Sequence, residues 1–385
     1  MAQALSAQFV AEIPVNPDVL KWARTLRGLS LIEAADRLEV PLSELEAYES
    51  GSRRPTIGTL QRMATRYQIN YVSLFMPQPL KADVPDIPDR RTRREHESKE
   101  LSLETRVVLQ EVSDTLDALA DLKQDVPELF ASVARLEPML RNESAHDLAN
   151  RQRSRFGVTI RAQREWPSDA YALRAWRNAI EHRGVFVYLE SMGDECSGAT
   201  IEREGLYAIV VNDAETNNGA RIFTMFHEYC HVLRRQTAIS DERKGNPVER
   251  YCNVFAADFL VPFSALDNVL GAPTKRRDFD VNELGKLARS FKVSLAAMAI
   301  RLEEGGWAKD GTYEQVFAIT RKRVKKTLTG EYKINPITQQ ARRLGRRHTE
   351  ITLEALSRGA INRADAKGLL KLDPGRFSAL KVAVR

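Results

Sequence analysis

The chain has 385 residues, of which 29% are charged and 43% are hydrophobic, and this composition predicts a folded protein of two or three domains. No apolar run reaches the roughly 18 to 20 residues of a membrane-spanning helix, and the start of the chain lacks a signal-peptide pattern. Three cysteines cannot form a closed disulfide framework. These features exclude membrane proteins and disulfide-stabilised secreted proteins, and predict a cytoplasmic protein without a membrane partner.

The positive charge of the chain is concentrated near the C-terminus. The net charge is +6, and residues 308–385 alone hold 18 Lys and Arg against 7 Asp and Glu. The strongest clusters are residues 321–326, 342–343 and 346–347. They are compatible with contact to nucleic acid, with a dock for an acidic partner or, as the simplest interpretation, with a solvated helix face.

The N-terminal part of the chain is expected to be a compact set of short helices over residues 16–76. Ser30 and Glu33 form a capping-box pattern ahead of apolar positions at helical spacing. The helix after that one is expected to stop at Gly51. Several prolines and a run of mixed charges assign residues 77–100 to a linker.

Residues 101–182 have a helical pattern and are expected to form a connecting region. The periodicity then changes, because residues 184–189 and 207–211 are rich in strand-forming side chains and predict a small sheet. We expect turns around Gly193, Asp194, Gly198 and Gly205. Helices are predicted from about Ala220, over residues 248–259, and through most of the remainder.

The strongest chemical signal is the pair His227 and His231 with Glu228 between them. Residues four apart on a helix leave it on the same face, so both imidazoles can bind one metal ion. Glu228 is placed to reach a water molecule at the metal, as in the H-E-x-x-H arrangement of metallopeptidases. The surrounding apolar residues favour a packed helix over a chance occurrence of the motif.

A third metal ligand is predicted on the following helix. Glu249 lies close enough along the chain for a loop to bring it back to the histidine pair. Asn253, one turn further, is expected to accept a hydrogen bond from the distal nitrogen of a liganding histidine. Cys230 and Cys252 are interpreted as small buried thiols rather than ligands. Four histidines have no partner pattern and are expected to be ordinary surface or core residues: His96, His146, His182 and His348.

These residues carry a family resemblance. Residues 221–231, RIFTMFHEYCH, followed by residues 249–262, ERYCNVFAADFLVP, resemble the ImmA/IrrE metallopeptidases, with Val261 in place of the usual Met. The resemblance implies Zn²⁺ held by His227, His231 and Glu249, with Glu228 as the general base. An oxyanion partner is also expected, and the sequence leaves it open among Tyr207, Tyr251 and several arginines.

Residues 18–76 resemble the XRE-type helix-turn-helix, a five-helix DNA-binding domain. Four residues are candidate DNA contacts: Ser30, Ser43, Arg53 and Arg54. The module is electrically neutral, because residues 1–83 hold 9 basic and 9 acidic side chains, and its second helix has Leu31 where the family commonly has Gln. DNA binding and a protein-binding or dimerising role therefore both stay open.

Together these patterns predict a mostly helical α+β protein. The expected order is a helix-turn-helix domain, the linker, the connecting region, a zincin-like metallopeptidase core at 183–305 with a small β-sheet, and a basic helical region at 306–385. The leading interpretation is a zinc metallo-endopeptidase that cuts a specific protein such as a repressor. The alternative, which follows from the resemblance, is a transcriptional regulator or antitoxin that binds operator DNA and a toxin, with the peptidase-like domain as a scaffold. A homodimer would suit a helix-turn-helix protein.

Overall fold

The computed structural model describes residues 13–79, 101–235, 247–318 and 335–384, apart from residues 193–195 and isolated positions within these ranges. Several predictions fall outside the described residues: most of the linker (80–100), His96, Gly193, Asp194 and the basic cluster 321–326. The chain divides into two compact units, and residues 101–110 group with the N-terminal unit while the chain from residue 111 forms the second. Among the described residues, no helix has the length and apolar character needed to cross a membrane.

The N-terminal unit is a bundle of short helices around its own apolar core, which contains Leu20, Leu45, Leu60 and Tyr67. The capping box is formed as predicted, with Ser30 and Glu33 bonded to each other's backbone N–H groups. The fifth element is a 3₁₀-helix rather than an α-helix. The elements are α1 (Pro17–Thr25), α2 (Leu31–Leu38), α3 (Leu42–Glu49), α4 (Ile57–Arg66) and η1 (Tyr71–Phe75).

The second unit is built on a three-stranded sheet with the order β1-β3-β2, in which β1 is parallel and β2 antiparallel to β3. Strand β2 was not predicted from the sequence. Its first residue, Gly198, was expected to lie in a turn. Glu204 and Gly205, both with positive φ, make the two-residue hairpin between β2 and β3. The strands are β1 (Val185–Glu190), β2 (Gly198–Arg203) and β3 (Leu206–Asn212).

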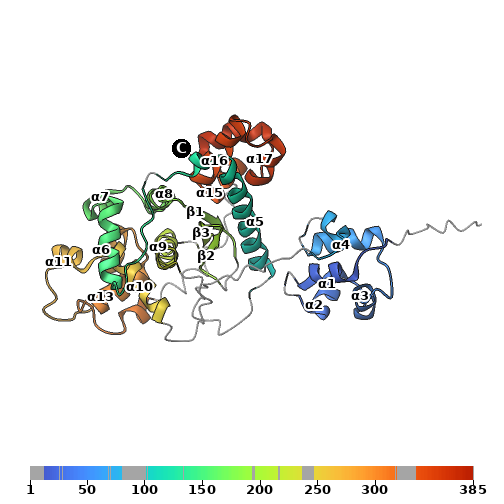
Figure 1. Ribbon diagram of the computed structural model, residues 1–385. Helices are drawn as coiled ribbons and strands as arrows, with labels where there is room; N and C mark the ends of the chain where they lie inside the picture. Colours follow the sequence, from blue (N-terminus) through green and yellow to red (C-terminus); the bar gives the residue numbers. More distant parts are fainter. Residues whose placement is uncertain are drawn as a thin grey trace, which may run out of the picture. The chain divides into compact units, whose positions relative to one another are not determined.

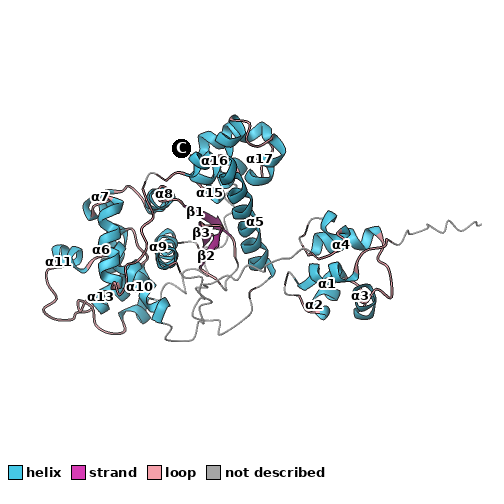
Figure 2. Cartoon of the chain, in the orientation of Figure 1, coloured by secondary structure: helices cyan, strands magenta, loops and turns pink. Residues whose placement is uncertain are grey.

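Helices cover both faces of this sheet (Figures 1 and 2). Val187 of β1 faces the core beneath α8 and α9, whereas Tyr188 points to the opposite face and meets His348. Because both faces are covered, every residue of β1 is buried and the strand shows no polar–apolar alternation. The helices before and around the sheet are α5 (Leu103–Asp125), η2 (Pro127–Phe130), α6 (Ala145–Phe156), α7 (Ile160–Glu165), α8 (Asp169–Glu181) and α9 (Asn218–Arg234).

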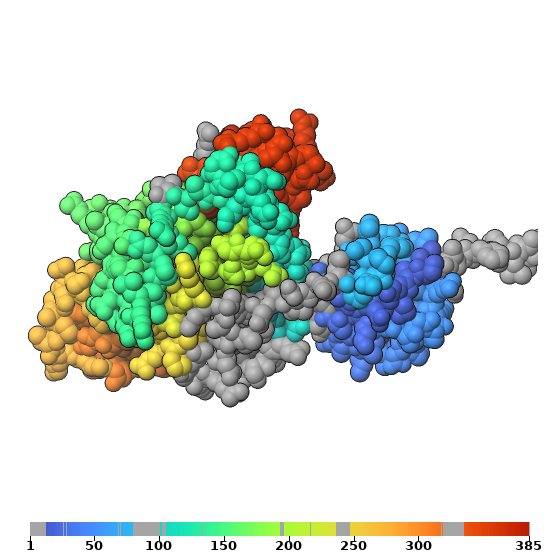
Figure 3. All heavy atoms as spheres, viewed as in Figure 1, coloured from blue at the N-terminus to red at the C-terminus, as the bar shows by residue number. Residues whose placement is uncertain are grey.

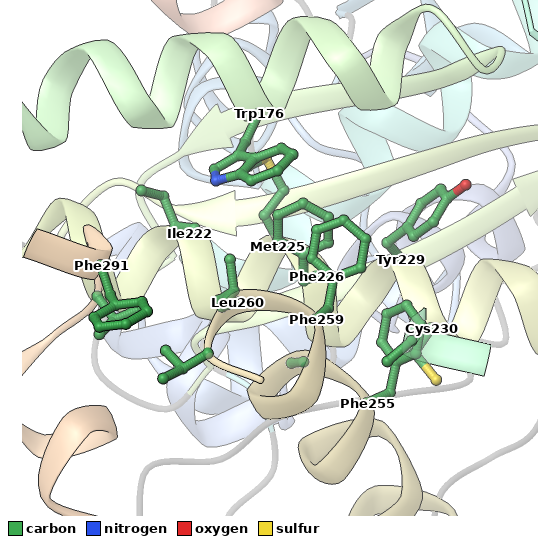
Figure 4. Close-up of a cluster of buried hydrophobic side chains, with 14 of the residues drawn as sticks. Trp176, Ile222, Met225, Phe226, Tyr229, Cys230, Phe255, Phe259, Leu260 and Phe291 are labelled. Atoms are coloured by element: carbon green, nitrogen blue, oxygen red, sulfur yellow. The ribbon is translucent and has the colours of Figure 1, made fainter. Parts of the chain in front are cut away.

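Aromatic rings of α9 pack against rings of α8 and of the helix that follows α9 (Figure 4). Phe226 of α9 stacks on Phe259 of the next helix with ring centroids 4.1 Å apart, and Trp176 of α8 meets Phe226 edge-on at 5.1 Å. Phe226 directly precedes His227, so this packing holds the backbone of the H-E-x-x-H turn. The helices that follow are α10 (Pro247–Leu260), α11 (Phe263–Leu270), α12 (Val281–Phe291) and α13 (Leu295–Glu304).

The C-terminal helices lie beside α5 (Figure 3), and α15 packs on β1 at the second face of the sheet. His348 is fully buried, and its Nδ1 lies 2.9 Å from the Tyr188 hydroxyl. Arg343 pairs with Glu190 at the end of β1, and Arg342 pairs with Asp213, so these two basic residues hold the helices to the sheet. The elements are α15 (Pro336–Leu344), α16 (Arg346–Ser357), α17 (Arg363–Leu370), η3 (Pro374–Arg376) and α18 (Phe377–Ala383).

Candidate metal centre

The side chains of His227, His231 and Glu249 lie close together in the structure. Helix α9 begins at Asn218, two residues before the predicted start, and carries His227 and His231 on one face. Their Nε2 atoms lie 3.2 Å apart. Glu249, in the first turn of α10, places one carboxylate oxygen 3.1 Å from His227 Nε2 and the other 3.4 Å from His231 Nε2. Helix α10 packs directly against α9, and this packing brings Glu249 to the two histidines.

The distal ring nitrogens face the same helix that supplies the carboxylate. His227 Nδ1 lies 3.0 Å from Asn253 Oδ1, and His231 Nδ1 lies 3.7 Å from Cys252 Sγ. When each Nδ1 carries the proton for these contacts, each Nε2 presents a lone pair. Two lone pairs and a carboxylate then converge in a site where His227 is 0% and His231 3% exposed.

This arrangement fits a divalent cation. Three electron-pair donors this close together repel one another unless a positive charge lies between them. The ligand atoms of His227, His231 and Glu249 all fall within 4.8 Å of one another, which suits coordination of one ion. Two imidazoles and one carboxylate are a ligand set found in catalytic zinc sites that keep one position open.

Glu228, the residue after His227 on α9, is buried and is held by the edge strand of the sheet. Its Oε2 accepts a 2.8 Å hydrogen bond from the Thr200 hydroxyl on β2. A Cβ added to Gly198 would come within 3.1 Å of Glu228 Oε1 and 2.5 Å of a Thr224 methyl group. Strand β2 therefore approaches the carboxylate too closely for any side chain at position 198.

Thr200 and Cys252 are contacts that sequence reasoning missed. Thr200 lies on the strand that was not predicted, so nothing in the sequence connected it to Glu228. Cys252 is buried as expected, but its sulfur also touches His231. Burial and the neighbouring Cys230 thiol raise the pKa of Cys252 well above its usual value, so it stays a thiol at neutral pH. Its contact with a histidine could have been predicted from its position directly before Asn253, which was already expected to contact a liganding histidine.

The two tyrosine candidates for the oxyanion partner differ in their surroundings. The Tyr251 hydroxyl donates a 3.0 Å hydrogen bond to the Glu143 carbonyl oxygen. Partial burial raises the pKa of Tyr251, and this keeps the hydroxyl a donor. Tyr207 lies at the start of β3 and packs against the apolar core. The Tyr251 hydroxyl is therefore engaged with a backbone carbonyl group.

The candidate DNA contacts of the N-terminal unit differ in their exposure and in their contacts. The Ser30 hydroxyl is engaged in the cap of α2. Ser43 and Arg54 are exposed. Arg53 is exposed beside Glu44 at 3.5 Å and over the Tyr48 ring.

Comparisons with known proteins match two separate parts of the chain. Residues 180–303 match a peptidase family model described as IrrE N-terminal-like domain, and residues 20–74 match a model described as Helix-turn-helix. No curated protein and no solved structure matches the chain. The two matches confirm the expected fusion of an N-terminal helix-turn-helix domain with an IrrE-like peptidase domain.

Proposed function

We propose that the protein is a zinc-dependent endopeptidase that cleaves a specific protein, such as a repressor, with residues 183–305 as its catalytic core. The observation that carries the proposal is the convergence of His227, His231 and Glu249 beside Glu228. The matched peptidase family implies a divalent metal, and the ligand set favours zinc. We also propose the remaining domain boundaries predicted from the sequence: a linker at 77–100, a connecting region at 101–182 and a C-terminal region at 306–385.

Each residue of the site has a separate task. When bound, a zinc ion supplies Lewis acidity, which makes water nucleophilic at neutral pH and polarises a peptide carbonyl. Glu228 accepts the proton of the attacking water and transfers it to the leaving amine. Thr200 holds the Glu228 carboxylate in place over 2.8 Å, and Asn253 orients the His227 ring.

The proposal is tested with the full-length protein and Glu228→Gln. Metal content is measured by mass spectrometry of the purified proteins, and cleavage is measured with a quenched fluorescent peptide library. We expect one zinc per chain in both proteins and loss of at least about 100-fold in cleavage rate for the variant, in keeping with removal of a general base. Absence of zinc from the wild type, or equal cleavage by both proteins, contradicts the proposal.

We also propose that the N-terminal unit binds DNA and makes the peptidase a regulatory protein. The helix-turn-helix match and the exposed Arg53 and Arg54 favour this second function. The antitoxin alternative, with an inert peptidase-like scaffold and a toxin partner, gains no support from the site or the comparisons.

A gel shift at low salt tests DNA binding. The probe is the DNA upstream of the protein's own gene. The variant carries both Arg53→Ala and Arg54→Ala. We expect a shift for the wild type that weakens in the double variant and with added salt, because phosphate contacts release counterions. The exposed acid Glu46, changed to Gln, is the matched control on α3 and should not weaken the shift. A wild type that gives no shift contradicts this function and leaves the peptidase proposal intact.

A further inference from the structure

The two histidines of the candidate metal site each contact one of two adjacent residues of α10. His227 and His231 turn their Nε2 atoms toward each other, 3.2 Å apart, and toward Glu249. Their Nδ1 atoms face α10, where Asn253 meets His227 and Cys252 meets His231. Asn253 is a familiar kind of partner for such a ring, whereas a cysteine thiol is not.

The contact between Cys252 and His231 is a buried one. Cys252 is 0% exposed and His231 is 3% exposed. The Cys252 Sγ lies 3.7 Å from His231 Nδ1, a distance that suits a hydrogen bond to the larger sulfur atom.

The geometry points to Cys252 as a positioning residue for His231: its sulfur accepts a hydrogen bond from Nδ1–H, which leaves Nε2 as the metal-binding nitrogen and holds the ring toward Glu249. This inference rests on the proposed metal site. The thiol itself is not placed as a ligand, because it lies at Nδ1, on the side of the ring away from Nε2. Replacing it therefore removes the orientation of a ligand and keeps all three ligands.

The test measures metal affinity and the environment of the ion rather than proteolysis. Cys252→Ala removes the acceptor, and Cys252→Ser restores one with a hydroxyl. Cys230→Ala is the matched control, because Cys230 is equally buried and lies beside Cys252 but makes no described contact with either histidine ring. Zinc affinity is measured by competition with a chromogenic chelator, and the Co²⁺-substituted full-length proteins are compared by electronic absorption.

We expect Cys252→Ala to weaken zinc binding about 10- to 100-fold, the range typical for loss of a residue that orients a metal-bound histidine, and to alter the Co²⁺ d–d bands. Cys252→Ser should recover most of the affinity, and Cys230→Ala should stay within about threefold of the wild type. Circular dichroism of the metal-free proteins checks folding. If the alanine variant does not fold, Cys252→Val, which fills the space without an acceptor, takes its place.

Wild-type affinity and spectrum in Cys252→Ala or its valine substitute overturn the inference. The inference is also overturned if zinc binding is weakened in Cys252→Ser and Cys230→Ala as much as in Cys252→Ala. The effect would then come from packing and not from loss of the acceptor. These outcomes are distinct from failure of the proposed function, in which the wild-type protein itself takes up no zinc or Co²⁺.

Discussion

Thr200 on the edge strand and Glu228 on α9 are joined by a 2.8 Å hydrogen bond between the Thr200 hydroxyl and Oε2 of the carboxylate. The same hydroxyl lies 3.2 Å from the Glu228 carbonyl oxygen. Both side chains are buried, with Thr200 8% and Glu228 0% exposed. The bond therefore ties the position of the proposed general base to the sheet, and the sheet becomes part of the site.

Thr200→Val should slow peptide cleavage by about 10- to 100-fold, because a hydrogen bond to a charged group contributes about 1.5 to 3 kcal/mol. Zinc content should not change, since the described contacts of the Thr200 side chain are with Glu228 and not with the three proposed ligands. Thr200→Ser keeps the hydroxyl and should retain most of the rate. Cleavage of a substrate from the peptide library measures the effect, and equal rates for the valine variant and the wild type would exclude this role.

Gly198→Ala should impair both folding stability and cleavage. Its Cβ would lie 2.5 Å from a Thr224 methyl group and 3.1 Å from Glu228 Oε1, so β2 or α9 must shift. Such overpacking costs about 1 to 3 kcal/mol of unfolding free energy. Gly368→Ala is the control, because a Cβ there meets no atom within 4 Å. Thermal unfolding and cleavage are compared, and similar behaviour of the two variants would contradict the close approach of β2.

Asn253→Ala should weaken zinc binding about 10- to 100-fold, because His227 loses the acceptor that lies 3.0 Å from its Nδ1. Asn253→Asp retains an acceptor oxygen and should bind zinc more tightly than the alanine variant. Val254→Ala changes an exposed neighbour and should have no effect. Chelator competition measures all three. An alanine variant with wild-type affinity would show that His227 needs no partner on α10.

Acid should destabilise the second unit through His348. Burial lowers the pKa of His348 from 6.5 to about 4, while the unfolded chain keeps the ordinary value. The unfolded state therefore binds the proton first, and stability present at pH 7 is lost as the pH falls toward 4. The loss between pH 7 and pH 5 is about 2 kcal/mol.

Denaturant unfolding of wild type and His348→Gln at these two pH values measures this contribution. The glutamine variant lacks the titrating group, so its free energy of unfolding should fall less between pH 7 and pH 5 than that of the wild type. An identical fall in the two proteins would show that His348 does not titrate differently in the folded and unfolded states.

Glu49→Gln should loosen the N-terminal unit. Arg24 bonds both carboxylate oxygens of Glu49, at 2.7 and 2.8 Å, and the two side chains are 9% and 7% exposed. Removal of one partner leaves a largely buried charge, at a cost of about 3 kcal/mol. Hydrogen exchange of the α1 and α3 amides should accelerate in this variant and not in Glu46→Gln, since Glu46 is exposed. Unchanged exchange would show that the ion pair does not stabilise the unit.

Local patterns in the sequence were sufficient for the elements whose stability is local. The capping box of Ser30 and Glu33 places the start of α2, because the cap and the helix it begins are neighbours along the chain. The spacing of His227 and His231 places both rings on one face of α9 for the same reason. The mostly helical fold with a small sheet, and the helix-turn-helix fused to a peptidase domain, also follow from residues close in sequence.

The tertiary structure decided what depends on contacts between distant segments. Strand β2 exists because it pairs with β3 and packs on α9, and its glycine is required by that close approach rather than by a turn. Thr200 reaches Glu228 across 28 positions of the chain, and Cys252 reaches His231 across 21. Periodicity describes which face of one element is apolar. It carries no information on which side chain of another element lies opposite, so only packing reveals these partners.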